Sequence, residues 1–269
     1  MQRISRALLP IYTALAVGYL FLPISVMIAF SFNDPRGRQN ITWQGFTIEN
    51  YFDVWRRPDI TGPMTDSLVI AIVATIVATA LGTLIGLALT RYEFRGQGPL
   101  NLLIYVPMAT PEVILGASLL ALWVTAGIQR GLETIIIAHI MFNISFVVVT
   151  VRARIAGFNR SLEEAAMDLG ADEWTTFRKV TFPLIFPGIM AAALLAFALS
   201  IDDYVITSFV AGQTTTFPLW VYGASRFGVP PEVNVLGTLI FVVAFIFIVA
   251  QILWSRRQRW TLRSTEASP

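Results

Sequence analysis

The fold of this chain is decided by the sequence SLVIAIVATIVATALGTLIGLALT at residues 67–90, which contains no charged side chain. A helix needs about 20 residues to cross the hydrocarbon core of a bilayer, so this run is long enough to span a membrane. Together with five similar runs, it gives six candidate spans: Leu8–Phe32, Ser67–Thr90, Leu100–Gly127, Thr134–Val151, Phe182–Gly212 and Val233–Ser255. None of them alternates apolar and polar residues as membrane strands do, so the sequence predicts an all-α bundle of six transmembrane helices.

The composition agrees with a chain embedded in a membrane. Of its 269 residues, 55% are hydrophobic and 13% are charged, which excludes a soluble enzyme, a disordered chain and a collagen-like fibre. The chain has no cysteine and a single histidine, His139, so neither disulfides nor a Cys/His metal site is expected. The first run follows Arg3 and Arg6, but it is too long for a signal peptide and lacks a small-residue cleavage site, so we expect it to be retained.

The basic residues orient the predicted bundle. Most of the 19 Lys and Arg residues lie in the N-terminus, the 91–99 loop, the 152–181 loop and the C-terminal tail. Because loops rich in Lys and Arg stay in the cytoplasm, both termini are predicted to be cytoplasmic. We interpret the tail residues Arg256, Arg257 and Arg259, with tryptophans on either side, as a membrane anchor and expect no nucleic-acid partner.

The whole chain, residues 1–269, is predicted to form a single transmembrane domain. Its largest extracytoplasmic loop is expected at about residues 33–66, with a short interfacial helix around residues 48–56. Within the second span, Gly82 and Gly86 have the small-xxx-small spacing that lets helices approach closely.

A polar segment of about 30 residues, at 152–182, separates the fourth and fifth predicted spans and is long for a simple connection. Ser161 and Glu164 have the spacing of a capping box, which predicts that a helix begins there, and Gly170 stands where a left-handed C-cap is expected. Asp172 can cap a second short helix that bears Trp174 and Phe177. The segment is therefore predicted to be a helical hairpin that docks against another protein.

This segment resembles the EAA loop of binding-protein-dependent ABC importer permeases, whose pattern is EAA, three residues, G, nine residues, I, one residue, L and P. Here Glu164-Ala-Ala is followed at the same spacing by Gly170, Val180 and Phe182-Pro183, with two conservative replacements. The resemblance implies a permease of the type I ABC importer kind whose loop sits in a cleft of a cytoplasmic ATPase. The coupling residues that it implies are Glu163, Glu164, Ala165, Ala166, Asp168 and Gly170.

Two further stretches, residues 106–116 and 199–212, resemble the spermidine/putrescine permease group and its C-type subunit. The resemblance implies a bacterial inner-membrane complex with a homologous permease subunit in a heterodimer, two ATPase subunits and an extracytoplasmic polyamine-binding protein. The only lysine, Lys179, is not part of a Gly-rich phosphate-binding loop. We therefore expect ATP and Mg²⁺ on the partner ATPase, and neither a cofactor nor covalent chemistry in this chain.

Three acidic residues fall within the predicted spans, where each carboxylate costs about 2.5–3.5 kcal/mol at the bilayer centre. Water, a cationic substrate or a partner subunit would offset this cost. On a continuous fifth helix, Asp203 lies on a polar face, so it is predicted to line the path, whereas Asp202 is expected to pair with a partner subunit or with local backbone. The predicted substrate-path residues are Asp203, Asp202, Tyr204, Glu112, Ser200 and Thr207.

Several alternatives remain open at this point. The two aspartates would instead cap a helix break. Thr110, Pro111 and Glu112 would be the N-cap and the first two residues of a helix that restarts after the break made by the prolines Pro107 and Pro111. His139 and Asn143, which lie one turn apart on the fourth span, are expected to form hydrogen bonds to other helices and not to act as a proton relay. An ABC permease for a sugar, iron or an anion is the alternative function. A proton-coupled transporter would not need the hairpin. A membrane hydrolase would need a Ser/His pair or carboxylates that bind a metal, and the sequence indicates neither.

Overall fold

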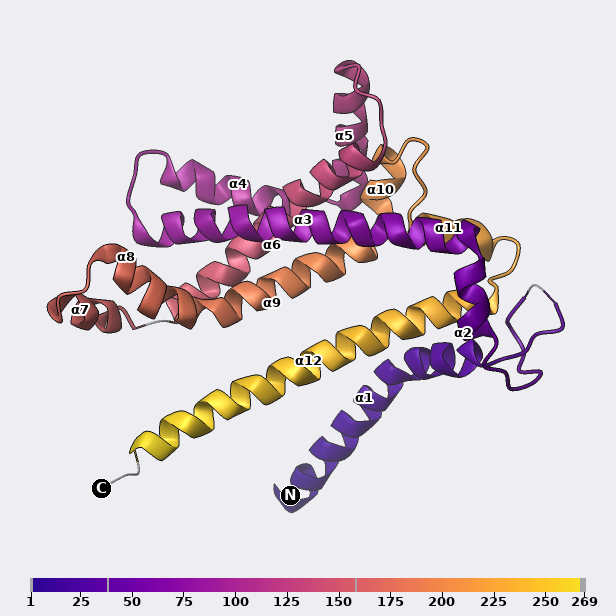
Figure 1. The fold of residues 1–269 in the computed structure, drawn as a ribbon, viewed down its shortest axis with the longest axis horizontal. Helices are drawn as coiled ribbons and strands as arrows, with labels where there is room; N and C mark the ends of the chain where they lie inside the picture. Colours follow the sequence, from indigo (N-terminus) through magenta and orange to yellow (C-terminus); the bar gives the residue numbers. More distant parts are fainter. Residues whose placement is uncertain (1, 38, 158, 267–269) are drawn as a thin grey trace. The chain divides into compact units, whose positions relative to one another are not determined.

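The computed structural model describes residues 2–37, 39–157 and 159–266, and this part of the chain is helical almost throughout (Figure 1). Among these residues, the only β-type pairing is an isolated bridge between Asn33 and Phe46. The prediction of an all-α protein is therefore confirmed for the described part. The chain divides into two compact units, Met1–Thr61 with Val221–Pro269, and Gly62–Trp220.

The first unit is built from the two ends of the chain. Its helices are α1 (Gln2–Ser31), α2 (Asn50–Asp53), a 3₁₀ turn (Val54–Arg56) and α12 (Pro231–Glu266). Helix α1 packs beside α12, where an added Cβ at Gly237 would come 2.7 Å from the sulfur of Met27. The short helix that we expected around residues 48–56 is confirmed by α2 and the 3₁₀ turn. The side chains of the C-terminal basic tail lie outside the described residues.

The loop between α1 and α2 is organised by Asn33, whose side chain is fully buried. Its amide donates to Oδ1 of Asn40 at 2.6 Å and to the carbonyl of Thr42 at 2.9 Å, while its Oδ1 accepts from the backbone amide of Gln44 at 2.7 Å. These bonds replace the water that the loop's polar groups lose on burial. The loop is shorter than predicted, because the following helix already begins at Pro58, a residue suited to a helix start.

The second unit contains most of the remaining helices. They are α3 (Pro58–Arg91), α4 (Gln97–Ala109), α5 (Glu112–Thr125), α6 (Leu132–Ala156), α7 (Ser161–Asp168), α8 (Glu173–Thr176), a π-helical turn (Phe177–Thr181), α9 (Phe182–Ile201) and α10 (Val205–Val210). The boundary between the units at Trp220 and Val221 falls within α11 (Phe217–Ser225). Helices α6 and α9 run side by side and bury Val147, Val151, Ile185 and Ile189 between them (Figure 1).

Four helices among the described residues are long and apolar enough to cross a membrane: Leu9–Ser31, Pro58–Arg91, Leu132–Ala156 and Glu173–Ile201. Helices α4 and α5 pass the same test as a pair, but they meet at an angle of 107°, so the third predicted run is not one straight helix. The sixth run falls in α12, which is apolar over residues 231–247. The number of six crossings and the side of the termini stay predictions.

The fifth predicted span, Phe182–Gly212, is not one continuous helix, so the prediction of a single helix there was wrong. Helix α9 ends at Ile201 and α10 begins at Val205. The cause is Asp203, whose carboxylate accepts the backbone amides of Ile206 at 3.4 Å and of Thr207 at 2.8 Å. A carboxylate that satisfies the free amides of a helix start favours a new helix over continuation of the old one. The alternative of a capped helix break is therefore confirmed for Asp203.

At Gly82, α3 approaches α6 more closely than at Gly86. A Cβ added to Gly82 would lie 2.6 Å from Cγ1 of Val147, whereas one added to Gly86 would lie 3.5 Å from Cγ1 of Val151, an ordinary contact. We expect Gly82→Ala to destabilise the fold by about 1–3 kcal/mol, because the α3–α6 contact must open, and Gly86→Ala to have little effect. Thermal unfolding in detergent measures the difference. Equal midpoints for the two variants would contradict this packing.

Candidate functional site

The three carboxylates predicted within the spans converge on one cavity of about 320 Å³. Glu112 comes from the start of α5, while Asp202 and Asp203 come from the break between α9 and α10. The other lining residues are mostly apolar: Pro107, Met108, Thr110, Leu115, Phe142, Phe146, Leu199, Tyr204, Val205 and Ile206. No Lys or Arg is among the described residues that line it, so ionised carboxylates there attract cations and repel anions.

The bend between α4 and α5 brings Glu112 into this cavity. Pro111 is the N-cap of α5 and Glu112 its first residue, so the predicted restart after the prolines is confirmed, displaced by one position. A negative charge is favourable there because it faces the positive end of the helix dipole. Glu112 is exposed in this chain, which leaves its carboxylate accessible from the cavity.

The two neighbouring aspartates differ in their surroundings. The side chain of Asp203 is only 6% exposed, and its Oδ2 accepts from the hydroxyl of Thr207 at 2.6 Å and lies 3.3 Å from Nε2 of His139. Asp202 is exposed, and its side chain forms no ion pair with any of the described residues. The sequence predicted the opposite division, with Asp202 paired and Asp203 free to meet the substrate. The geometry makes Asp202 the more accessible carboxylate.

His139 lies at the centre of the polar cluster that surrounds Asp203. Its Nδ1 lies 2.6 Å from Oγ of Ser200 and its Nε2 lies 3.0 Å from Oγ1 of Thr207. Since the single hydroxyl hydrogen of Thr207 is donated to Asp203, Thr207 accepts a hydrogen bond from Nε2 of His139. The imidazole therefore joins α6 to both sides of the helix break.

The surroundings of His139 differ from the sequence prediction at Ser200, Thr207 and Asn143. Ser200 and Thr207 were expected on the substrate path, but they are 3% and 0% exposed and bind His139. His139 forms the hydrogen bonds to other helices that were expected of it, whereas the side-chain amide of Asn143 has no hydrogen-bond partner among the described residues. Ser200 near the end of α9 and Thr207 in α10 both face His139 on α6. Tyr204 lies where predicted, at the cavity wall.

Replacing His139 by Ala is expected to reduce stability by about 2–4 kcal/mol, because three buried polar groups lose their common partner. His139→Gln keeps a donor and an acceptor in similar positions and should lose less than half of that amount. Thermal unfolding of the purified variants in detergent measures both effects. A wild-type midpoint for His139→Ala would show that the cluster does not hold the helix break.

The second candidate site is the hairpin of residues 161–176, which lies at the opposite end of its unit from α10 (Figure 1). Gly170 closes it with a φ of +89°, and its amide donates to the carbonyl of Met167 at 2.9 Å. Asp172 then caps α8 by accepting the amide of Thr175 at 3.1 Å. Hydrogen bonds from the side chain and from the backbone amide of Thr175 hold the pKa of Asp172 below its ordinary value. The predicted glycine C-cap, aspartate N-cap and two-helix hairpin are all confirmed.

The predicted capping box at the start of α7 was wrong. Arg160 is the N-cap residue, Ser161 is already helical, and no side chain of the N-cap residue caps the helix. Instead, Oδ1 of Asn159 accepts the backbone amide of Ser161 at 3.1 Å. An Asn two residues before an amide forms this local bond readily, so it competes with a reciprocal pair between Ser161 and Glu164.

The hairpin exposes large apolar side chains. The exposed fractions are 49% for Leu162, 44% for Met167, 90% for Leu169 and 67% for Trp174. Among the predicted coupling residues, Glu164, Ala165, Asp168 and Gly170 are exposed and Ala166 is half-buried. An apolar surface bordered by charged residues is typical of a site that binds another protein.

Glu163 is the exception, because its side chain points into the unit. Its carboxylate receives two hydrogen bonds from the guanidinium of Arg91, at 2.5 and 2.6 Å, and one from the hydroxyl of Thr181. Burial alone would raise the pKa of Glu163, but these bonds and the charges of Arg91 and Arg160 hold it below its ordinary value. The pair therefore stabilises the fold at neutral pH, and this contribution is lost as the pH falls through the lowered pKa. The sequence had predicted that Glu163 contacts a partner protein, but its side chain is not oriented to do so.

The cavity in a broken apolar bundle and the exposed hairpin are features of a membrane permease, and comparison with known proteins identifies the family. Residues 78–260 match the family described as the binding-protein-dependent transport system inner membrane component, and the chain belongs to this family. The resemblance found in the EAA segment is therefore confirmed, as is location in the inner membrane.

Individual relatives cover most of the chain. It is 38% identical over 240 residues to the spermidine/putrescine transport system permease protein PotC of Escherichia coli K12, covering 89% of this chain and 90% of that protein. It is 36% identical over 261 residues to the putrescine transport system permease protein PotI of the same strain, covering 94% and 92%. A chain of a bacterial ABC transporter involved in alginate import has the same fold, with a TM-score of 0.69, 16% identity and coverage of 95% and 98%.

Proposed function

We propose that the chain is a permease subunit of an ABC importer and forms half of a path for polyamines such as spermidine and putrescine. The observation that carries this proposal is the convergence of Glu112, Asp202 and Asp203 on one cavity without a lysine or arginine. The similarity to permeases named for spermidine and putrescine supports the same substrate class.

The cavity suits a flexible polycation. Protonated amines interact favourably with the accessible carboxylates of Asp202 and Glu112, while the alkyl segments between amines contact the apolar wall formed by residues such as Phe142 and Leu199. A few charges on an apolar surface attract such a molecule without trapping it, as transport requires. An anion would be repelled, and a sugar would find few hydrogen-bonding groups there.

The hairpin is the proposed attachment to a separate ATPase, which binds ATP and Mg²⁺. Glu164, Ala165, Ala166 and Asp168 would lie in a cleft of the ATPase, and the tight turn at Gly170 would keep them in position. ATP binding would draw this hairpin and that of a homologous permease subunit together, so the bundle would change from inward-facing to outward-facing. An extracytoplasmic polyamine-binding protein would deliver the substrate, and the family description, which refers to binding-protein-dependent transport, supports a binding protein as a partner.

The proposal is tested by uptake into proteoliposomes that contain the chain together with a second permease subunit, an ATPase and a binding protein from the same organism. We expect uptake of labelled spermidine that requires ATP, competes with putrescine and resists a proton uncoupler. Uptake driven by a proton gradient without ATP would contradict the ABC mechanism. ATP-dependent uptake of a sugar or an anion, with none of spermidine, would contradict the substrate assignment.

A further inference from the structure

A buried ion pair connects three elements that are far apart in the sequence. Arg91 is the last residue of α3, Glu163 lies in α7 and Thr181 ends the π-helical turn before α9. The guanidinium of Arg91 binds both carboxylate oxygens of Glu163, and Thr181 donates to one of them. Glu163 is 4% exposed and Thr181 is 3% exposed. The hairpin is therefore attached to α3 through the buried carboxylate of Glu163, which is paired with Arg91 and accepts hydrogen bonds on both oxygens.

This attachment is additional to the covalent connections of the hairpin. The chain itself links the hairpin only to α6 before it and to α9 after it. The link to α3 is made through side chains, by a bidentate arginine–carboxylate pair whose geometry is more directional than that of a single contact. At the other end of this attachment, α3 contacts α6 closely at Gly82, so it belongs to the packed bundle.

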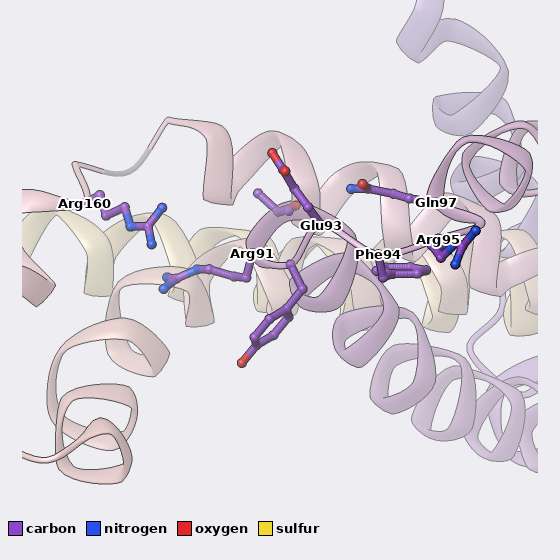
Figure 2. A pocket seen from close by; sticks show the side chains of 8 residues that line it. Arg91, Glu93, Phe94, Arg95, Gln97 and Arg160 are labelled. Carbon is purple, nitrogen blue, oxygen red and sulfur yellow. The ribbon is translucent and has the colours of Figure 1, made fainter.

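Figure 2 shows the surroundings of Arg91. It lines a pocket of about 600 Å³ formed by residues 90–95, Gln97 and Arg160, in which the side chains of Arg91 and Arg160 extend toward each other while Arg95 lies at the far side. The charge of Arg160 also acts on the Glu163 carboxylate. Glu93 lines the same pocket but is exposed and has no part in the ion pair. The burial and the partners of Glu163 thus distinguish it from the other acidic residues of this surface.

We propose that Arg91, Glu163 and Thr181 form a joint that makes α3 move together with the hairpin when the ATPase acts on it. Glu163 is then a positioning residue and does not contact the ATPase. This inference rests on the proposed coupling function. Without the joint, a displaced hairpin would bend relative to α3, and part of its movement would not reach the membrane helices.

The first experiment measures coupling in the reconstituted complex as the number of ATP molecules hydrolysed per spermidine imported. We expect Glu163→Gln to raise this ratio about tenfold, which is within the usual range of coupling effects, and Thr181→Val to raise it about twofold to threefold. The exchanged pair Arg91→Glu with Glu163→Arg should restore much of the coupling. The matched control is Glu93→Gln, which removes a neighbouring carboxylate and should leave the ratio unchanged.

A merely structural role for the ion pair would reduce the amount of assembled complex without changing the ratio. An assembled Glu163→Gln complex with the wild-type ratio would therefore overturn the proposal. If that variant does not assemble, Thr181→Val decides the question, and a wild-type ratio for it has the same meaning.

A second measurement does not depend on the transported substrate. Because the sequence has no cysteine, spin labels are introduced selectively through Tyr92→Cys and Leu169→Cys, at positions that are 69% and 90% exposed. In the full chain in nanodiscs, we expect one narrow distance distribution, which broadens when Glu163→Gln is added. An unchanged distance distribution would overturn the proposed joint. If the distribution broadens but the complex does not import spermidine, only the proposed substrate is overturned.

Discussion

Spermidine uptake by the double variant Glu112→Gln, Asp202→Asn is expected to fall by roughly 10–100-fold, because each carboxylate lost from the cavity removes about 0.7–1.4 kcal/mol of attraction for an ammonium group. Both residues line the cavity, and both are exposed within the chain. Their neutral replacements have nearly the same size, so packing should be retained. Initial rates of labelled spermidine uptake, normalised to assembled complex, measure the effect.

The single variants separate the roles of the two aspartates. Asp202→Asn should lower uptake with little change in the unfolding midpoint, whereas Asp203→Asn should lower the midpoint as well, because Asp203 is bonded to Thr207 and lies beside His139. The matched control is Glu133→Gln, an exposed carboxylate at the start of α6 that does not line the cavity. Uptake within twofold of wild type by the assembled double variant would remove the cavity from the path.

Glu164→Arg is expected to reduce ATP-driven uptake at least tenfold while the protein still inserts in the membrane. Glu164 is exposed on the hairpin, so reversing its charge changes the docking surface without disturbing the buried neighbours. A misplaced like charge at an interface costs several kcal/mol, which is sufficient to weaken ATPase binding or coupling. Uptake, ATP hydrolysis and copurification of the ATPase are measured on the same preparation.

Gly170→Pro tests the same surface through its shape. Proline cannot adopt the φ of +89° observed at Gly170, and it lacks the amide that donates to Met167. We expect a similar loss of uptake, and a smaller loss for Gly170→Ala, whose added methyl group meets no atom within 4 Å. Normal uptake by both Glu164→Arg and Gly170→Pro would contradict a coupling role for the hairpin.

Local signals in the sequence predicted much of this structure correctly. Long apolar runs predicted membrane helices, Pro107 and Pro111 predicted the interruption between α4 and α5, and Gly170 and Asp172 predicted the turn and the second helix of the hairpin. Each of these signals acts through the residue's own backbone or its immediate neighbours, so no knowledge of the tertiary structure was required.

The errors concern residues whose partners are distant in the sequence. Glu163 and Glu164 are adjacent and equally acidic, and Arg91, 72 residues away, determines which of them is buried. The break after Ile201 contains no proline or glycine, and it is stabilised in part by His139 on a different helix. Spacing along one helix does not reveal such partners. The sequence therefore did not show that Ser200, Thr207 and Asp203 lie against His139.

Site-directed cross-linking is the most direct test of whether the hairpin binds a separate ATPase. With no native cysteine, the chain provides a clean background for Leu169→Cys, at a position that is 90% exposed, and for the control Tyr92→Cys outside the hairpin. We expect a short cross-linker to join the ATPase to the Leu169→Cys variant, and we expect nucleotide to change the yield of this cross-linked product. The control variant should give much less product. A hairpin that never cross-links in an ATP-hydrolysing, transporting complex would contradict the claim.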